Sequence, residues 1–167
     1  MNVNAYAARH SDFTDKIDVI CPKCGRKALV IGASVYASVA EYEKNVRFSC
    51  VACGYAVKYG NTPKFTAFIN TKGKAVQGRM LFLNTTCDPF FGFGLWYMIE
   101  TPYGTLWAYN LDHLSVIEHH IADRKRERNG LPNQNNSIAS RLPKWAKDAK
   151  HRDSLLRLIL RFKTAKS

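Results

Sequence analysis

The chain has 167 residues, of which 46% are hydrophobic and 23% are charged, a composition that can build a core and excludes wholesale disorder. Its formal net charge of +12 is typical of a protein that contacts a polyanion. No run of 18 apolar residues is present, which excludes a membrane-spanning helix. Residues 1–13 lack the apolar segment of a signal peptide. We therefore expect a cytoplasmic protein.

Two Cys-x-x-Cys-Gly motifs lie in the first third of the sequence. The first contains Cys21 and Cys24, and the second contains Cys50 and Cys53. A turn of this kind presents two sulfur atoms to one point, and the glycine that follows lets backbone amides turn toward the sulfurs. The segments around the motifs predict a turn over 41–45 and strands over 16–20, 27–37, 46–49 and 55–59. This layout predicts a zinc ribbon over residues 16–62.

Four cysteines in two matched pairs predict one structural zinc ion as the cofactor. A redox dithiol would use one pair beside a βαβ unit, and four thiolates leave no open position for catalysis. An iron–sulfur cluster and unrelated cysteines are the remaining alternatives. The fifth cysteine, Cys87, stands alone and is interpreted as a small buried apolar residue.

Residues 63–128 predict a lobe of β-hairpins followed by one helix. Strands are expected over 65–70, 79–86, 95–100 and 105–109. Aromatic side chains are concentrated in or beside the last two of these strands: Trp96, Tyr97, Tyr103, Trp107 and Tyr109. We interpret them mainly as core residues, with Tyr103 at the turn as the best candidate for stacking on a base.

The helix of this lobe is predicted to start after Asn110 as its N-cap. Apolar residues recur at helical spacing in one stripe, formed by Leu111, Leu114, Ile117 and Ile121. The cluster of Arg124, Lys125, Arg126 and Arg128 is expected in the last turn, before a stop at 129–130.

Six polar residues of the same helix are candidates for a metal or catalytic site: Asp112, His113, Glu118, His119, His120 and Asp123. Adjacent histidines on a helix point about 100° apart and cannot easily share one ion. No His-Glu-x-x-His motif is present. We therefore interpret these residues as a solvated face or as contacts with the hairpin.

Residues 129–167 are interpreted as a linker and a basic helical tail. A polar linker over 133–137 precedes a helical turn over 137–142, a short helix that starts at Pro143, and a final helix over 151–163. One face of the final helix is apolar and is formed by Leu155, Leu158, Ile159 and Phe162. Another face carries Lys150, Ser154, Arg157 and Arg161.

Positive charge is concentrated in this tail. Residues 124–167 contain 13 Lys and Arg against 3 acidic residues, whereas residues 1–123 have a net charge of +2. Phosphate contacts give affinity and position rather than sequence readout. The candidates for such contacts are Arg141, Lys144, Lys147, Lys150, Arg157 and Arg161.

The motifs Cys21-Pro-Lys-Cys-Gly25 and Cys50-Val-Ala-Cys-Gly54 resemble those of transcription factor B-type zinc ribbons, over residues 18–60. This resemblance implies the ribbon fold and the zinc ion. The whole chain is also similar to a group of uncharacterised bacterial zinc-ribbon proteins, a resemblance carried by Thr101-Pro-Tyr-Gly-Thr-Leu-Trp-Ala-Tyr-Asn110 and Ser140-Arg-Leu-Pro-Lys-Trp145. The second resemblance implies no function, because one fold serves many functions.

The sequence thus predicts an α+β protein with an N-terminal zinc ribbon and β-hairpin lobe followed by basic C-terminal helices. The function that we expect is non-enzymatic binding of nucleic acid, DNA or RNA, through the basic tail. The alternative is an adaptor subunit of a larger protein complex, anchored by the aromatic hairpin. An enzyme is disfavoured, since the sequence has no phosphate loop, nucleophile elbow or convincing acid–base pair.

Overall fold

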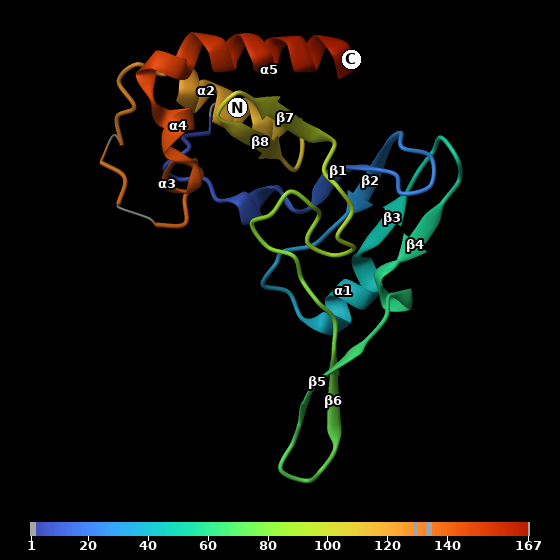
Figure 1. Cartoon of the computed structure of the whole chain (residues 1–167). Helices are drawn as coiled ribbons and strands as arrows, with labels where there is room; N and C mark the ends of the chain where they lie inside the picture. Colours follow the sequence, from blue (N-terminus) through green and yellow to red (C-terminus); the bar gives the residue numbers. More distant parts are fainter. Residues whose placement is uncertain (1–2, 129, 133–134, 167) are drawn as a thin grey trace. The chain divides into compact units, whose positions relative to one another are not determined.

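The computed structural model describes residues 3–128, 130–132 and 135–166, and it has the expected α+β fold. The chain forms two compact units (Figure 1), which we call the sheet unit, residues 14–95, and the helical unit, residues 1–13 with 96–167. The N-terminal segment belongs to the helical unit, where the N–H groups of Ile138 and Ala139 donate to the carbonyls of Ala8 and Ala5.

The sheet unit is built on four antiparallel strands in the order β1-β2-β3-β4. They are β1 (Lys16–Ile20), β2 (Lys27–Ile31), β3 (Arg47–Ser49) and β4 (Ala56–Lys58). Alternate side chains face the core, so that Ile17, Val19 and Val30 are fully buried. The second expected strand is shorter than the predicted range 27–37, because the chain leaves the sheet at Gly32, where a Cβ would overlap the Thr14 carbonyl oxygen.

Between β2 and β3 the chain forms a helix, α1 (Val39–Asn45), where the sequence analysis predicted a turn. The Ser38 hydroxyl accepts the Glu41 N–H, and the Glu41 carboxylate accepts the Ser38 N–H, so the two residues form a capping box. The buried Tyr42 fixes the helix on the unit. The Ser-x-x-Glu signal was therefore present in the sequence and was missed.

A long hairpin, β5 (Phe65–Ile69) and β6 (Ala75–Gly78), extends from the sheet unit (Figure 1). It follows the single 3-10 turn η2 (Tyr59–Asn61). The strand expected over 79–86 is not formed, because Arg79 turns inward. Its guanidinium donates to Glu43 at 2.6 Å and to the Tyr59 carbonyl at 3.1 Å.

The segment after the hairpin folds around Asp88. This buried carboxylate accepts the backbone N–H groups of Phe90, Phe91 and Phe93 at 2.7 to 2.9 Å. Burial raises the pKa of Asp88, although these hydrogen bonds oppose the shift. The aromatic residues around it pack edge to face against Tyr59 and Phe48, which closes the core of the sheet unit.

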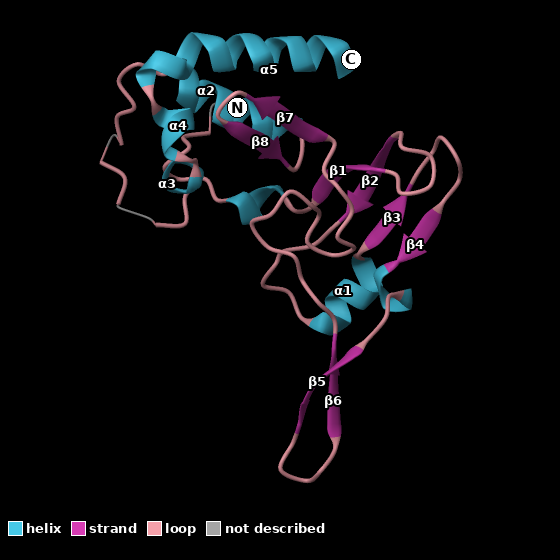
Figure 2. Cartoon of the chain, viewed as in Figure 1, coloured by secondary structure: helices cyan, strands magenta, loops and turns pink. Residues whose placement is uncertain are grey.

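The helical unit combines one hairpin with helices (Figure 2). Its elements are η1 (His10–Phe13), β7 (Tyr97–Thr101), β8 (Gly104–Ala108), α2 (Leu111–Ala122), α3 (Ile138–Arg141), α4 (Lys144–Lys147), η3 (Ala149–His151) and α5 (Arg152–Lys166). Residues from all of these regions except η3 share one apolar cluster, in which Leu114, Leu155 and Ile159 are fully buried. Of the predicted linker, residues 133 and 134 lie outside the described residues.

The ends of α2 differ in how well the sequence predicted them. Asn110 is the N-cap, as expected, and accepts the His113 N–H. The helix stops at Ala122, so the basic cluster from Arg124 onward lies beyond it and not in its last turn. Leu111, assigned to the buried stripe, is 48% exposed, whereas the other three stripe residues are buried.

Candidate metal centre and basic surfaces

The two cysteine motifs form turns with the same hydrogen bonds. Cys21 donates to the Arg26 carbonyl at 2.8 Å and Gly25 donates to the Cys21 carbonyl at 2.9 Å. The second turn has the equivalent bonds. The Cys50 N–H donates to the Tyr55 carbonyl at 2.8 Å, and the Gly54 N–H donates to the Cys50 carbonyl at 2.9 Å. Both glycines have positive φ, +70° and +74°, a conformation that favours glycine.

These turns bring the four sulfur atoms together, all within 4.8 Å of one another. Cys21 Sγ lies 3.7 Å from Cys53 Sγ, and Cys24 Sγ lies 3.6 Å from Cys50 Sγ. A tetrahedron with Zn–S bonds of about 2.3 Å has an edge of about 3.8 Å. The four predicted ligands can therefore hold a metal ion, and the two shortest sulfur–sulfur distances are close to this tetrahedral edge.

The four thiols interact electrostatically with one another and with the backbone of their turns. Burial would raise the pKa of Cys21, but hydrogen bonds from the backbone of Cys24 and Lys23 outweigh it and lower the pKa to about 7. A backbone hydrogen bond from Arg26 lowers the pKa of Cys24, yet burial and the three neighbouring thiols raise it to about 11. Four adjacent thiolates repel one another, and a bound cation reverses this effect.

Five of the six residues predicted to contact phosphate are exposed, and they lie on or beside α3, α4 and α5 of the helical unit: Arg141, Lys144, Lys150, Arg157 and Arg161. The sixth, Lys147, is half-buried and donates to the Ala139 carbonyl at 3.4 Å. Lys150 forms an exposed ion pair with Asp148 at 3.5 Å. Arg157 and Arg161 are four residues apart on α5 and therefore neighbours on one face.

The positive charge is divided between the units more evenly than the linear sequence suggests. The sheet unit contains 11 Lys and Arg against 5 acids and the helical unit 14 against 8, so each has a net charge of +6. Residues 44–87 contain seven Lys and Arg and no Asp or Glu. This acid-free stretch was missed in the sequence analysis, although a scan for acidic residues would have found it.

The aromatic hairpin β7–β8 packs largely within its own unit. Tyr103 lies 3.7 Å from the His151 ring, nearly parallel to it, so the residue expected to stack on a base already stacks on a side chain. Lys166 lies over the Trp96 ring and His10 stacks on Trp107. Tyr97 is buried, and Trp96 and Trp107 are partly buried.

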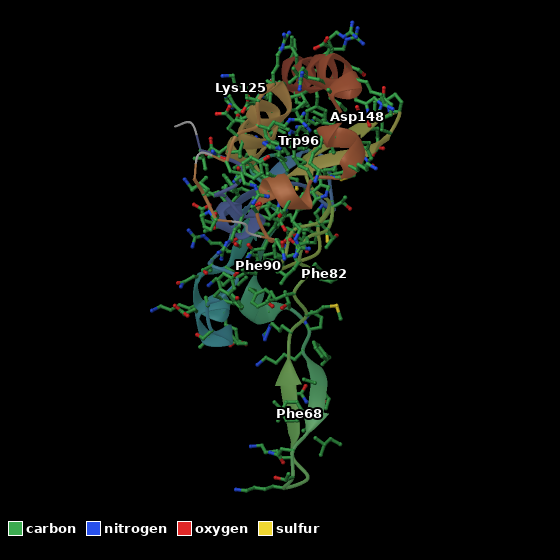
Figure 3. The ribbon with its side chains drawn as sticks, turned by 90° about the vertical axis from the view of Figure 1, so that its left-hand side faces the viewer. Phe68, Phe82, Phe90, Trp96, Lys125 and Asp148 are labelled. Carbon is green, nitrogen blue, oxygen red and sulfur yellow. The ribbon has the colours of Figure 1, made fainter. Side chains whose placement is uncertain are left out.

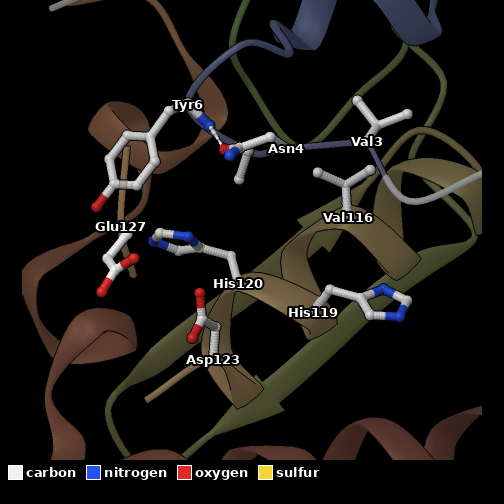
Figure 4. A pocket seen from close by; sticks show the side chains of 9 residues that line it. Val3, Asn4, Tyr6, Val116, His119, His120, Asp123 and Glu127 are labelled. Atoms are coloured by element: carbon white, nitrogen blue, oxygen red, sulfur yellow. Dashed lines mark hydrogen bonds between the residues drawn. The ribbon is translucent and has the colours of Figure 1, made fainter. Parts of the chain in front are cut away.

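The two adjacent histidines of α2, His119 and His120, point in different directions, as their adjacent positions predict. They line a cavity of about 390 Å³ that also contains Asp123, Glu127 and Tyr6 (Figure 4). His119 bonds to the Ser115 carbonyl at 2.7 Å, whereas His120 faces Tyr6 edge to face. Burial, helped by Arg126, lowers the pKa of His120 to about 4. In the described part of the chain, only the four cysteines form a group close enough to hold a metal ion.

One histidine expected on the solvated face or against the hairpin is completely buried. His113 Nδ1 accepts the Tyr109 N–H at 3.1 Å, and His113 Nε2 lies 3.1 Å from His10 Nδ1. The first bond requires an unprotonated Nδ1, so the Nε2–H donates to His10. Burial lowers the pKa of both rings, to about 4 for His10 and well below the usual histidine value for His113.

The lone cysteine, Cys87, is half-buried, with its thiol 3.3 Å from the Thr85 hydroxyl. It takes no part in the cysteine cluster.

No helix among the described residues has the length and apolar character needed to cross a bilayer. Comparisons of the chain with protein-family models, with curated proteins and with solved structures gave no match.

Proposed function

We propose that the protein is a non-enzymatic, cytoplasmic zinc-ribbon protein that binds nucleic acid through the basic helices α3, α4 and α5. Zinc is the metal that four thiolates at tetrahedral spacing favour, and its role here is structural, since all four positions of the ion are filled by cysteine. Thiolate ligands of this kind are typical of a reducing compartment.

The exposed cations of α3–α5 are the observation that carries this proposal. Buried Leu155 and Ile159 hold α5 on the helical unit, which leaves Arg157 and Arg161 directed outward. Among the described residues, Arg141, Lys144, Arg157 and Arg161 have no acidic side chain within ion-pair distance. Several phosphates along one strand can therefore be contacted at once.

The adaptor alternative depends on the aromatic hairpin as an exposed anchor. Because Tyr103, Trp96 and Trp107 contact other side chains of the helical unit, no specific observation favours that function over nucleic-acid binding.

The salt dependence of binding tests the proposal. Arg157→Gln with Arg161→Gln should weaken binding to a random DNA or RNA duplex and reduce the log–log salt slope by about 2, because each arginine neutralises about one phosphate. Arg124→Gln with Lys125→Gln removes the same charge from exposed positions beyond α2 and should change the slope less. Equal effects of the two double variants would indicate net charge rather than a surface. Wild-type protein that binds neither DNA nor RNA at low salt would refute the proposal.

A further inference from the structure

The β5–β6 hairpin exposes large apolar side chains along its stem. Phe65 is 45% exposed, Phe68 58% and Ile69 68%, and every residue of β5 is exposed. Figure 3 shows Phe68 far along the hairpin, away from Phe82 and Phe90 of the same unit. Exposed aromatic side chains grouped in this way, here Phe65 and Phe68, indicate a binding surface.

A β-bulge places the two phenylalanines on one face of the hairpin. Phe65 pairs with Gly78 and Phe68 pairs with Val76, and the register shifts between Thr66 and Phe68. Cross-strand partners share a face and alternate along a strand, so Phe65, Phe68, Val76 and Gly78 lie together. A Cβ at Gly78 would contact the Phe65 ring at 3.7 Å, in agreement with this assignment.

Ile69 lies on the opposite face. It pairs with Ala75, which has the same orientation as Gln77 on β6. Gln77 in turn donates to the Thr66 hydroxyl at 2.9 Å. The bulge therefore separates an aromatic face from a face that carries Ile69, Thr66 and Gln77.

The turn of the hairpin is cationic, and hydrogen bonds to the Asn70 side chain close it. Asn70 Oδ1 accepts the N–H groups of both Lys72 and Lys74 at 3.0 Å. Both lysines are exposed and form no ion pair with any described residue. They lie within the acid-free stretch of residues 44–87, so the hairpin complements a polyanion.

We propose that the aromatic face of the β5–β6 hairpin binds single-stranded nucleic acid. Unpaired bases stack on Phe65 and Phe68, while Lys72 and Lys74 contact the phosphates. Aromatic side chains beside positive charge are the combination that recognises single strands, since every base offers a π face. This inference deepens the proposed function and rests on it, because it adds a substrate class to a protein that binds nucleic acid.

Three other occupants fit the hairpin less well. A membrane would first meet the polar turn from Asn70 to Lys74, because the apolar residues lie along the stem and not at the tip. A protein strand added at the β5 edge, which carries Phe65 and Phe68, would meet the bulge, which interrupts regular edge pairing. A second copy of the chain would bring two cationic hairpins together, and like charges repel.

Binding by the full-length, zinc-loaded protein tests the inference. The probes are oligo(dT) and oligo(U) of about 20 nucleotides, longer than the ~4–16 that one binding fold covers, a duplex of equal length, and phosphatidylserine vesicles. Phe68→Ala should weaken single-strand binding by about 5- to 100-fold, with little effect on the duplex. Phe68→Leu should behave like Phe68→Ala, because it keeps the apolar volume and loses the π face, whereas Phe68→Trp should retain binding.

Ile69→Ala is the matched control, since it truncates a more exposed apolar residue on the opposite face and should leave binding unchanged. Lys72→Gln with Lys74→Gln should reduce the single-strand salt slope by about 1.4. Equal binding by Phe68→Ala and Ile69→Ala, or a Phe68→Ala effect confined to vesicles, would overturn this inference and leave the proposed function intact. Absence of all nucleic-acid binding by wild type would refute both.

Discussion

At the scale of single residues, the His10–His113 pair has the clearest physical consequence. His113 is fully buried on α2, and it bonds to a histidine of the N-terminal segment. Both rings have pKa values lowered chiefly by burial, with Arg141 as a further cause for His10 and the partner ring for His113. The folded protein therefore keeps both histidines neutral at pH 7, and protonation of the pair opposes folding.

We expect the helical unit to lose stability in acid. The unfolded chain binds protons on these histidines below about pH 6.5, whereas folded His10 does so only near pH 4. The two histidines therefore do not reduce the free energy of unfolding above pH 6.5. As the pH falls toward 4, that free energy decreases, by at most about 3 kcal/mol for His10. Thermal unfolding followed between pH 7.5 and pH 4 measures it.

A variant separates this effect from acid release of the metal, which is followed in parallel as zinc content. His10→Gln does not titrate and should reduce the pH dependence of the melting temperature, to which buried His113 and His120 still contribute, whereas His119→Gln, which changes an exposed imidazole, should have little effect on it. A wild-type melting temperature that stays constant from pH 7 to pH 5 would contradict the prediction.

At the scale of elements, α5 shows how an amphipathic helix presents charge by burying its other face. Leu155 and Ile159 have no exposed surface, Leu158 and Phe162 pack against the same cluster, and Leu160 is 62% exposed. The predicted apolar stripe is confirmed by this packing. The orientation of Arg157 and Arg161 follows from it, since they lie on the remaining face.

Two leucines of α5 provide a matched test of this orientation. Leu155→Ala should destabilise the protein by about 2–5 kcal/mol, because it removes buried methyl groups and leaves a cavity. Leu160→Ala deletes the same atoms at an exposed position and should change stability by less than about 0.5 kcal/mol. Chemical denaturation of the two variants measures the difference, and equal losses would show that the helix packs in another orientation.

At the scale of the whole molecule, the chain forms two units, and each is built from different segments of the sequence. The sheet unit contains the cysteine cluster, whereas the helical unit is assembled from both ends of the chain. Structural zinc sites contribute their binding free energy to folding. The sheet unit should therefore depend on metal more strongly than the helical unit does.

Removal of zinc should show this difference directly. With a chelator, or in Cys24→Ser and Cys53→Ser, we expect backbone amides of β1–β4 to lose protection from hydrogen exchange while those of α2 and α5 keep most of theirs. Elemental analysis should find one zinc ion per wild-type chain, and Cys87→Ser should retain it. Uniform loss of protection over both units, or a chain without zinc, would contradict the prediction.

Much of this protein is determined by signals that are local in the sequence. Strand β1 spans the predicted residues, Asn110 caps the predicted helix, and the cysteine spacing alone identified four side chains that meet in space. Each of these depends on interactions within a few residues or on two matched turns. The capping box at Ser38 is equally local, and the sequence analysis missed it because it interpreted the polar residues of 41–45 as a turn.

Other features were decided only by tertiary structure, because periodicity shows which face is apolar but not what covers it. The N-terminal segment pairs with residues more than a hundred positions away, and this contact buries His113 and joins the segment to the helical unit. The aromatic residues of β7–β8 find partners within their unit, whereas Phe65 and Phe68, equally apolar, find none that bury them and remain exposed. Exposure, and with it the candidate binding surface, depends on long-range packing that the sequence does not state.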